Sequence, residues 1–300
     1  MGSRVRIVER SRLPRHKVCG EFFSPEIEAE LKNLGAWDAF VRAGPARVPR
    51  MVLHFGMKCK RARLPEPAFG LSRYAFDRIL LDQAVDAGAD LAKEDGNEAP
   101  QIIATGRRAA GAARGRRLFG FKAHFEGPRE DAVELFFFGK CYVGVSCIES
   151  GKTNVCGLAP ESFLSKFEFE YDSLVLQCPA LAERLSPLRR ITEWFSTGPL
   201  EYGQAFELMK KNQYLAGDAL SFVDPFTGSG LLAAVRSGAM AGRAAAAGQP
   251  VEIYLKECAA SLRAPFQAAR ILRRALERGW AEKIAPFAPA RLLFALTRPK

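Results

Sequence analysis

The chain has 300 residues, 48% of them apolar and 26% charged, which is typical of a globular protein with room for one large or two ordinary domains. Basic residues outnumber acidic ones by 44 to 33, giving a net charge of +11, but no zinc-finger, RRM or KH signature accompanies them, which disfavours nucleic-acid binding. No apolar run reaches the roughly 20 residues of a membrane span, and the seven cysteines form no CxxC pair, so we expect a cytoplasmic protein.

The first third of the chain alternates strands with helices. A short buried strand ends at Glu9, and Ser24 followed by Pro25 begins a helix, because these residue types favour the N-cap and the first helical position. Apolar residues at helical spacing predict a longer helix from Tyr74, which Gly88 ends. The predicted elements are strands at 5–8, 52–55 and 101–104 and helices at 25–34 and 74–87.

The middle of the chain changes to a strand pattern. Short apolar runs separated by turns that carry glycine predict an antiparallel sheet of about four strands. Helices are expected over 160–190. A strand then runs to Asp218, and an alanine-rich helix extends from Gly230 to about Gly248, followed by basic helices. The predicted strands of the sheet are 119–125, 133–138, 141–147 and 153–158.

The segment from Leu215 to Leu231 carries the clearest chemical signal. A strand ends at a carboxylate, a loop rich in glycine and proline turns the chain, and a long helix begins. A helix N-terminus presents unpaired amides and about half a positive charge, which suits the negative charge that a reduced flavin gathers. Asp218 could accept a hydrogen bond from a ribityl hydroxyl, and Gly228 and Gly230 would let backbone approach the ring. The alternative is an ordinary turn with Asp218 as a cap.

Gly217-Asp-Ala followed by Asp224-Pro-Phe-Thr-Gly-Ser-Gly230 resembles the second FAD motif of the geranylgeranyl reductase and aromatic hydroxylase superfamily, which includes FAD-dependent monooxygenases. Other landmarks fall in the family's order over residues 4 to 248. They are the Lys17-Val-Cys-Gly20 loop, Leu71-Ser-Arg-Tyr-Ala-Phe-Asp77 and Asn154-Val-Cys-Gly-Leu158.

The resemblance implies FAD as cofactor and NAD(P)H as electron donor. It implies that Glu9 binds the adenosine ribose, that Cys19 and Gly20 pass close to the flavin, and that Arg73 neutralises the pyrophosphate. A solvated acid, a buried thiol and a surface arginine are the respective alternatives. The remaining implied cofactor-binding residues are Gly217, Asp218, Pro225, Gly228, Gly230 and Leu231.

The implied fold is α/β, with an incomplete Rossmann-like FAD-binding domain. Residues 1–110 and 200–250 would form that domain, 111–199 an antiparallel-sheet substrate domain and 251–300 the C-terminal helices. The family's first strand, Gly-rich loop and helix are absent, because the chain begins at what resembles the second strand. We therefore expect a truncated family member.

Two functions remain open. One is an oxidoreductase that reduces a C=C bond of a hydrophobic substrate or hydroxylates an aromatic one; halogenation is disfavoured because no Trp-x-Trp motif occurs. The other is a degenerate chain without flavin binding or catalysis. No catalytic acid or base can be named, and histidines 16, 54 and 124 show no metal-ligand spacing. The basic tail over 265–300 either covers the core or lies on a membrane surface.

Overall fold

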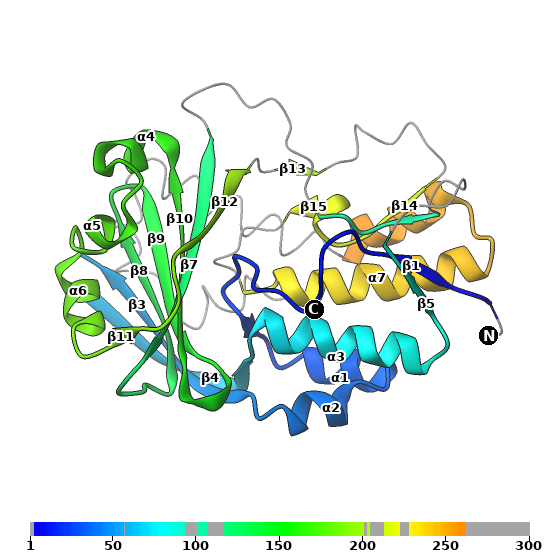
Figure 1. Cartoon of the computed structure of the whole chain (residues 1–300), viewed down its shortest axis with the longest axis horizontal. Coiled ribbons are helices and arrows are strands. Elements are labelled where there is room, and N and C mark those ends of the chain that lie inside the picture. Colours follow the sequence, from blue (N-terminus) through cyan, green and yellow to red (C-terminus); the bar gives the residue numbers. More distant parts are fainter. Residues whose placement is uncertain are drawn as a thin grey trace.

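The computed structural model describes residues 3–56, 58–93, 101–106, 117–200, 203–204, 213–222 and 228–261. One large sheet stands on the left in Figure 1, and helices with two short parallel strand pairs lie to its right. None of the described helices has the length and apolar character to cross a membrane. The predicted helices beyond residue 261, including the tail over 265–300, fall outside the described residues.

The large sheet has nine strands in the order β11-β7-β10-β9-β8-β3-β4-β2, and β12 also pairs with β7. Its strands are β2 (Phe22–Phe23), β3 (Ala46–Phe55), β4 (Lys58–Gly70), β7 (Leu118–Glu126), β8 (Ala132–Phe138), β9 (Cys141–Cys147), β10 (Thr153–Pro160), β11 (Arg189–Arg190) and β12 (Phe195–Leu200).

The four strands predicted in the middle of the chain are confirmed as β7 to β10, and each pairs antiparallel with its neighbour in the sheet. The sheet extends beyond these four strands, and β3 lies parallel to β8, with Val52 opposite Glu134. The long β3–β4 hairpin adds to this edge. The sheet is therefore mixed and draws strands from both sides of the boundary predicted at residue 110; the domain division itself stays a prediction.

One face of the sheet is covered by short helices. These are α4 (Glu161–Leu164), α5 (Tyr171–Val175) and α6 (Pro179–Leu185). Phe121, Val143 and Val155 of the sheet are fully buried against Leu174 and Leu181 of the helices. Burying a side chain of this size contributes about 1.5–3 kcal/mol, so this layer is a principal source of stability.

A buried carboxylate joins three of these elements. Glu134 of β8 accepts a hydrogen bond from Arg184 Nε of α6, and His54 Nε2 of β3 lies 3.5 Å from its other oxygen. Burial alone would raise the pKa of Glu134, but the contacts from His54 and Arg184 outweigh it and hold the pKa below its usual value.

The second part of the fold combines parallel strand pairs with helices. β1 (Arg6–Val8) pairs with β5 (Asp90–Ala92), and β6 (Ile102–Ile103) pairs with β14 (Tyr214–Leu215), all parallel. Within the described residues the two pairs are separate sheets. A third short pair, β13 (Gly203–Gln204) with β15 (Ser221–Phe222), is antiparallel. Parallel strands flanked by helices are the arrangement expected of a Rossmann-like layer.

Four helices pack beside these strands. They are α1 (Ile27–Asn33), α2 (Trp37–Arg42), α3 (Arg73–Asp86) and α7 (Gly230–Ala246), and residues 251–261 are also helical. Phe23, Phe40 and Phe76 form an aromatic centre on which Leu232 of α7 packs. Arg236 of α7 also pairs with Glu30 of α1 at 2.6 Å. The start of α7 is thereby fixed against the N-terminal helices.

Candidate functional site

The strand end that carries Asp218 is held against α7. β14 runs into a single 3-10 turn, Gly217–Ala219, and Gly217 has a φ of +58°, a left-handed conformation that glycine adopts without strain. The Gly217 amide donates to Ser237 Oγ of α7 at 2.9 Å. Tyr254 donates from its hydroxyl to the carbonyl of Leu215. These contacts fix the carboxylate-bearing turn on the side of the helix.

Two glycines stand at the start of α7, and only the first of them has a conformation that requires glycine. Gly228 has a φ of +67°, and a Cβ added there would lie 2.9 Å from the ring of Phe22. Gly230, the first residue of the helix, has open space around the position of its missing Cβ. The side chain of the N-cap residue, Ser229, makes no capping hydrogen bond to this helix. The close neighbour of Gly228 is Phe22 of the protein itself, so the expectation that Gly228 and Gly230 let backbone approach a flavin ring stays a prediction.

Phe22 brings the Cys19–Gly20 loop to the same place, because it follows that loop by two residues and lies against Gly228. Buried side chains of the large sheet hold the loop. Asn154 of β10 donates to the carbonyl of Cys19 at 3.1 Å, and Lys122 of β7 donates to the carbonyl of Lys17 at 3.2 Å. The loop therefore bridges the sheet and the helical part of the fold.

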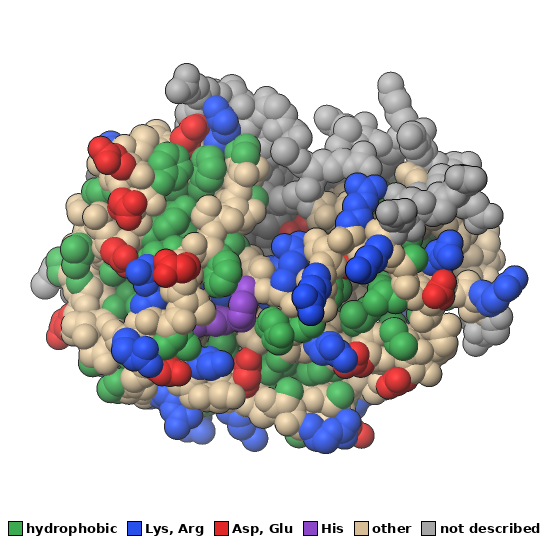
Figure 2. Space-filling view, viewed as in Figure 1, with side chains coloured by type: hydrophobic (Ala, Val, Ile, Leu, Met, Phe, Trp, Pro, Cys, Tyr) green, Lys and Arg blue, Asp and Glu red, His purple; other side chains and the backbone are tan. Residues whose placement is uncertain are grey.

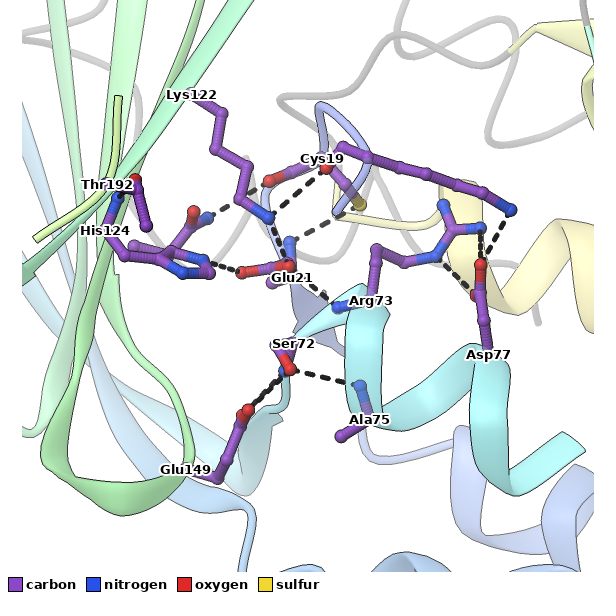
Figure 3. Close-up of polar contacts among 12 residues, drawn as sticks. Cys19, Glu21, Ser72, Arg73, Ala75, Asp77, Lys122, His124, Glu149 and Thr192 are labelled. Carbon is purple, nitrogen blue, oxygen red and sulfur yellow. Dashed lines mark hydrogen bonds and ion pairs between the residues drawn. The ribbon is translucent and has the colours of Figure 1, made fainter. Parts of the chain in front are cut away.

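Glu21 is the centre of this attachment (Figure 3). Its side chain is fully buried and receives hydrogen bonds from Lys122 Nζ, from His124 Nε2 at 2.7 Å and from the backbone amide of Arg73 at 2.7 Å. Burial alone would raise the pKa of Glu21, but His124 and Lys122 outweigh it and hold the pKa below its usual value. The carboxylate is therefore ionised and faces the positive end of the α3 dipole.

The predicted pyrophosphate ligand, Arg73, is engaged within the protein. Its guanidinium forms two hydrogen bonds to Asp77, at 2.8 and 3.0 Å, and Lys17 pairs with the same carboxylate at 2.7 Å. The group of two cations and one anion has a net charge of +1 and remains partly exposed. A phosphate bound there would share the guanidinium with Asp77.

Cys19 lies beside this group. Burial of its thiol raises the pKa, and the neighbouring charge of Arg73 only partly opposes the effect. The thiol is therefore protonated at neutral pH, which excludes a thiolate nucleophile at this position. A backbone contact to a ligand remains compatible with the structure.

The other predicted site residues occupy different places. Glu9 directly follows β1, and its carboxylate accepts a hydrogen bond from the Ser11 amide at 2.7 Å. Leu231 is partly buried against the aromatic centre that α7 covers. Pro225 lies outside the described residues. Glu9 and Asp218 thus stand just after two strands of different parallel pairs, while Cys19, Arg73 and Gly228 gather around one loop.

Basic side chains gather on the face shown in Figure 2, where the N-terminal segment crosses the molecule. The arginines of this segment at positions 4, 6, 10, 12 and 15 are all exposed. Such a surface raises the local concentration of anionic molecules.

Sequence reasoning did not single out Glu21, Lys122 or Asn154. One signal was present: Lys122 and His124 interrupt an otherwise apolar strand at two positions of the same face. Polar residues on a buried face require partners, and the partner here lies about a hundred positions away.

The sequence matches no protein-family model, and no curated protein matches it. Solved structures share its fold over nearly the whole chain. The flavin-dependent brominase Bmp2 is 16% identical, with a TM-score of 0.73, and the match covers 99% of this chain and 87% of that one. A flavoprotein/dehydrogenase from Cytophaga hutchinsonii is 17% identical, with a TM-score of 0.75, covering 99% and 86%.

A probable FAD-dependent monooxygenase, pqsL from Pseudomonas aeruginosa, is 16% identical with a TM-score of 0.67, and the match covers 98% of this chain and 92% of that one. Identities this low establish the fold alone. The chain thus has the fold of FAD-dependent halogenases and monooxygenases, in agreement with the resemblance found in the sequence.

Proposed function

We propose that this protein is an FAD-dependent oxidoreductase that acts on a hydrophobic or aromatic small molecule with NAD(P)H as electron donor. The observation that carries the proposal is the arrangement at the start of α7, in a fold shared with flavin enzymes. There a turn bearing Asp218 is fixed to the helix, and, apart from its own helix and chain neighbours, no described residue lies within 4 Å of the position that a Cβ of Gly230 would take. When bound, FAD would supply the electron transfer, and the protein would position it.

The described residues fit the ribityl and ring half of the cofactor. Asp218 would accept a hydrogen bond from a ribityl hydroxyl, and the first amides of α7 would stabilise negative charge at the ring. Cys19 and Gly20 would offer backbone groups from a loop that Glu21 holds rigid. Glu9 would accept from the ribose hydroxyls at the end of β1. The exposed arginines of the N-terminal segment favour an anionic dinucleotide over a neutral ligand.

A second candidate is a protein of this fold that binds a hydrophobic molecule without flavin chemistry. It is favoured by the parallel pairs β1–β5 and β6–β14, which are not hydrogen-bonded to each other within the described residues. A dinucleotide normally binds across a continuous parallel layer, where a glycine-rich turn receives its pyrophosphate.

Reconstitution with FAD separates the two candidates. The oxidoreductase proposal predicts that purified protein takes up one FAD per chain, turns yellow and oxidises NADH or NADPH. Asp218 is exposed, and Asp218→Ala should weaken FAD binding about tenfold, the effect of losing roughly one hydrogen bond to a charged group. Asp38→Ala removes an exposed aspartate of α2 and serves as the matched control. Protein that stays colourless with excess FAD would leave the second candidate.

A further inference from the structure

The fold brings together three side chains that the sequence keeps apart. His16, Glu21 and His124 each present one ligand atom, and these three atoms lie within 4.8 Å of one another. The rings of His16 and His124 meet edge-on with centroids 5.2 Å apart, and His124 Nε2 lies 2.7 Å from Glu21 Oε2. We propose that these residues form a binding site for a divalent transition-metal ion, for which Zn²⁺ is the natural probe. The proposal is independent of flavin binding.

The donor set suits such an ion. Two imidazoles and one carboxylate hold zinc in enzymes that keep a fourth position open, and the same set is found in iron sites. Donors about 2 Å from a tetrahedral ion lie roughly 3.3 Å apart, so Glu21 Oε2 and His124 Nε2 would separate slightly from their 2.7 Å contact to admit the ion. Glu21 is buried on a fixed loop, and His124 is buried on strand β7. Two of the three ligands are therefore held in place before any ion arrives.

His16 provides the observation that points to a ligand. Its Nδ1 is buried and has no hydrogen-bond partner among the described residues. The ring is held between Tyr74 and Phe195, with centroid distances of 5.2 and 5.3 Å. A buried imidazole nitrogen without a partner, on a ring packed beside a carboxylate and a second imidazole, is what a metal ion would satisfy.

The charges around the cluster set the character of the site. Lys122 donates to Glu21 Oε1, and an ion would replace the hydrogen bond between Glu21 Oε2 and His124 Nε2. The Lys122 ammonium repels a cation, and Lys152 acts on His16 in the same direction. An anion such as chloride or hydroxide in the open fourth position would offset both. His16 is only partly buried, so that position can reach solvent. We therefore expect moderate affinity and a single ion per chain.

Metal titration of the whole chain tests the proposal. Cys59 is exposed and Cys19 and Cys156 are only partly exposed, so Cys59→Ser removes the most accessible thiol. In that background we expect one Zn²⁺ per chain, measured by competition with a chromophoric chelator. His16→Ala should lower the affinity at least tenfold. His54→Ala removes a histidine of β3 that contacts Glu134 and is not a member of the cluster, so it should leave the affinity unchanged.

Substitution of His16 removes no hydrogen bond of the Glu21 network, so the variant should fold, and a far-ultraviolet circular dichroism spectrum checks this. His16→Gln repeats the Zn²⁺ titration with a polar side chain at this position. Co²⁺ bound to the wild-type protein should show d–d absorption without a thiolate charge-transfer band. The proposal is overturned if no one-to-one uptake occurs, if His16→Ala and His16→Gln bind as tightly as their parent, or if thiolate ligation appears.

Discussion

Replacing Glu21 by glutamine is the most informative test of how the loop over residues 17–21 is held. The change keeps the shape of the side chain but removes its charge, and one of its two oxygens becomes an amide donor. That donor would face either Lys122 or His124, which already donate to this position. Lys122 is completely buried, so its ammonium would remain in the interior without its counter-ion. Breaking a buried pair in this way costs about 3–5 kcal/mol.

A matched glutamate on the surface isolates the effect of burial. Glu28 pairs with Lys32 at 2.7 Å, but their side chains are 43% and 58% exposed. Glu28→Gln should therefore cost less than about 1 kcal/mol. Urea unfolding of both variants measures the two losses. The double variant Glu21→Gln/Lys122→Met should recover part of the loss, because no unpaired charge remains. Equal losses for Glu21→Gln and Glu28→Gln would refute the proposed role of the network.

Three further outcomes are expected. Gly228→Ala should lower the free energy of unfolding by about 1–3 kcal/mol, because Gly228 has a positive φ and lies next to the ring of Phe22. Gly238 is exposed within α7, and Gly238→Ala should raise the free energy of unfolding by about 0.5–1 kcal/mol. Thermal denaturation of both variants measures the two changes, and two changes of the same sign would contradict this reasoning. The lowered pKa of Glu134 stabilises the fold above the unfolded-state pKa, and this contribution is lost as pH falls through the folded-state pKa. Glu134→Gln should therefore show a smaller drop in stability on acidification than wild type, and an equal drop would count against the pairing. Asp218→Ala should weaken FAD binding while Asp38→Ala does not, as measured by titration.

Local sequence pattern predicted much of the fold. The strand over 141–147 agrees with β9 at both ends, and the predicted helix from Tyr74 differs from α3 by one residue at its start. Ser72 caps α3 by accepting the amide of Ala75, a contact of the type that local sequence encodes. The helix expected from Pro25 begins at Ile27 instead, because Ser24 to Glu26 form a turn whose first carbonyl accepts the Ile27 amide.

Long-range pairing accounts for what the sequence could not predict. The strand β4 is rich in charge and contains two prolines, so its own residues do not favour a strand; it forms because β3 pairs along it. Glu21 has a φ of +53°, unusual for a glutamate, and its partners come from β7 and from the start of α3. Nothing in the spacing of residues 16, 21 and 124 indicates that they meet.

Hydrogen exchange with and without FAD tests the account's central claim most directly. If the loop before Phe22 and the start of α7 together hold a flavin, FAD should slow amide exchange over 17–22, 214–222 and 228–235. Exchange over α5 and α6, on the outer face of the large sheet, should not change. Protection confined to other segments, or no protection at saturating FAD, would contradict the account.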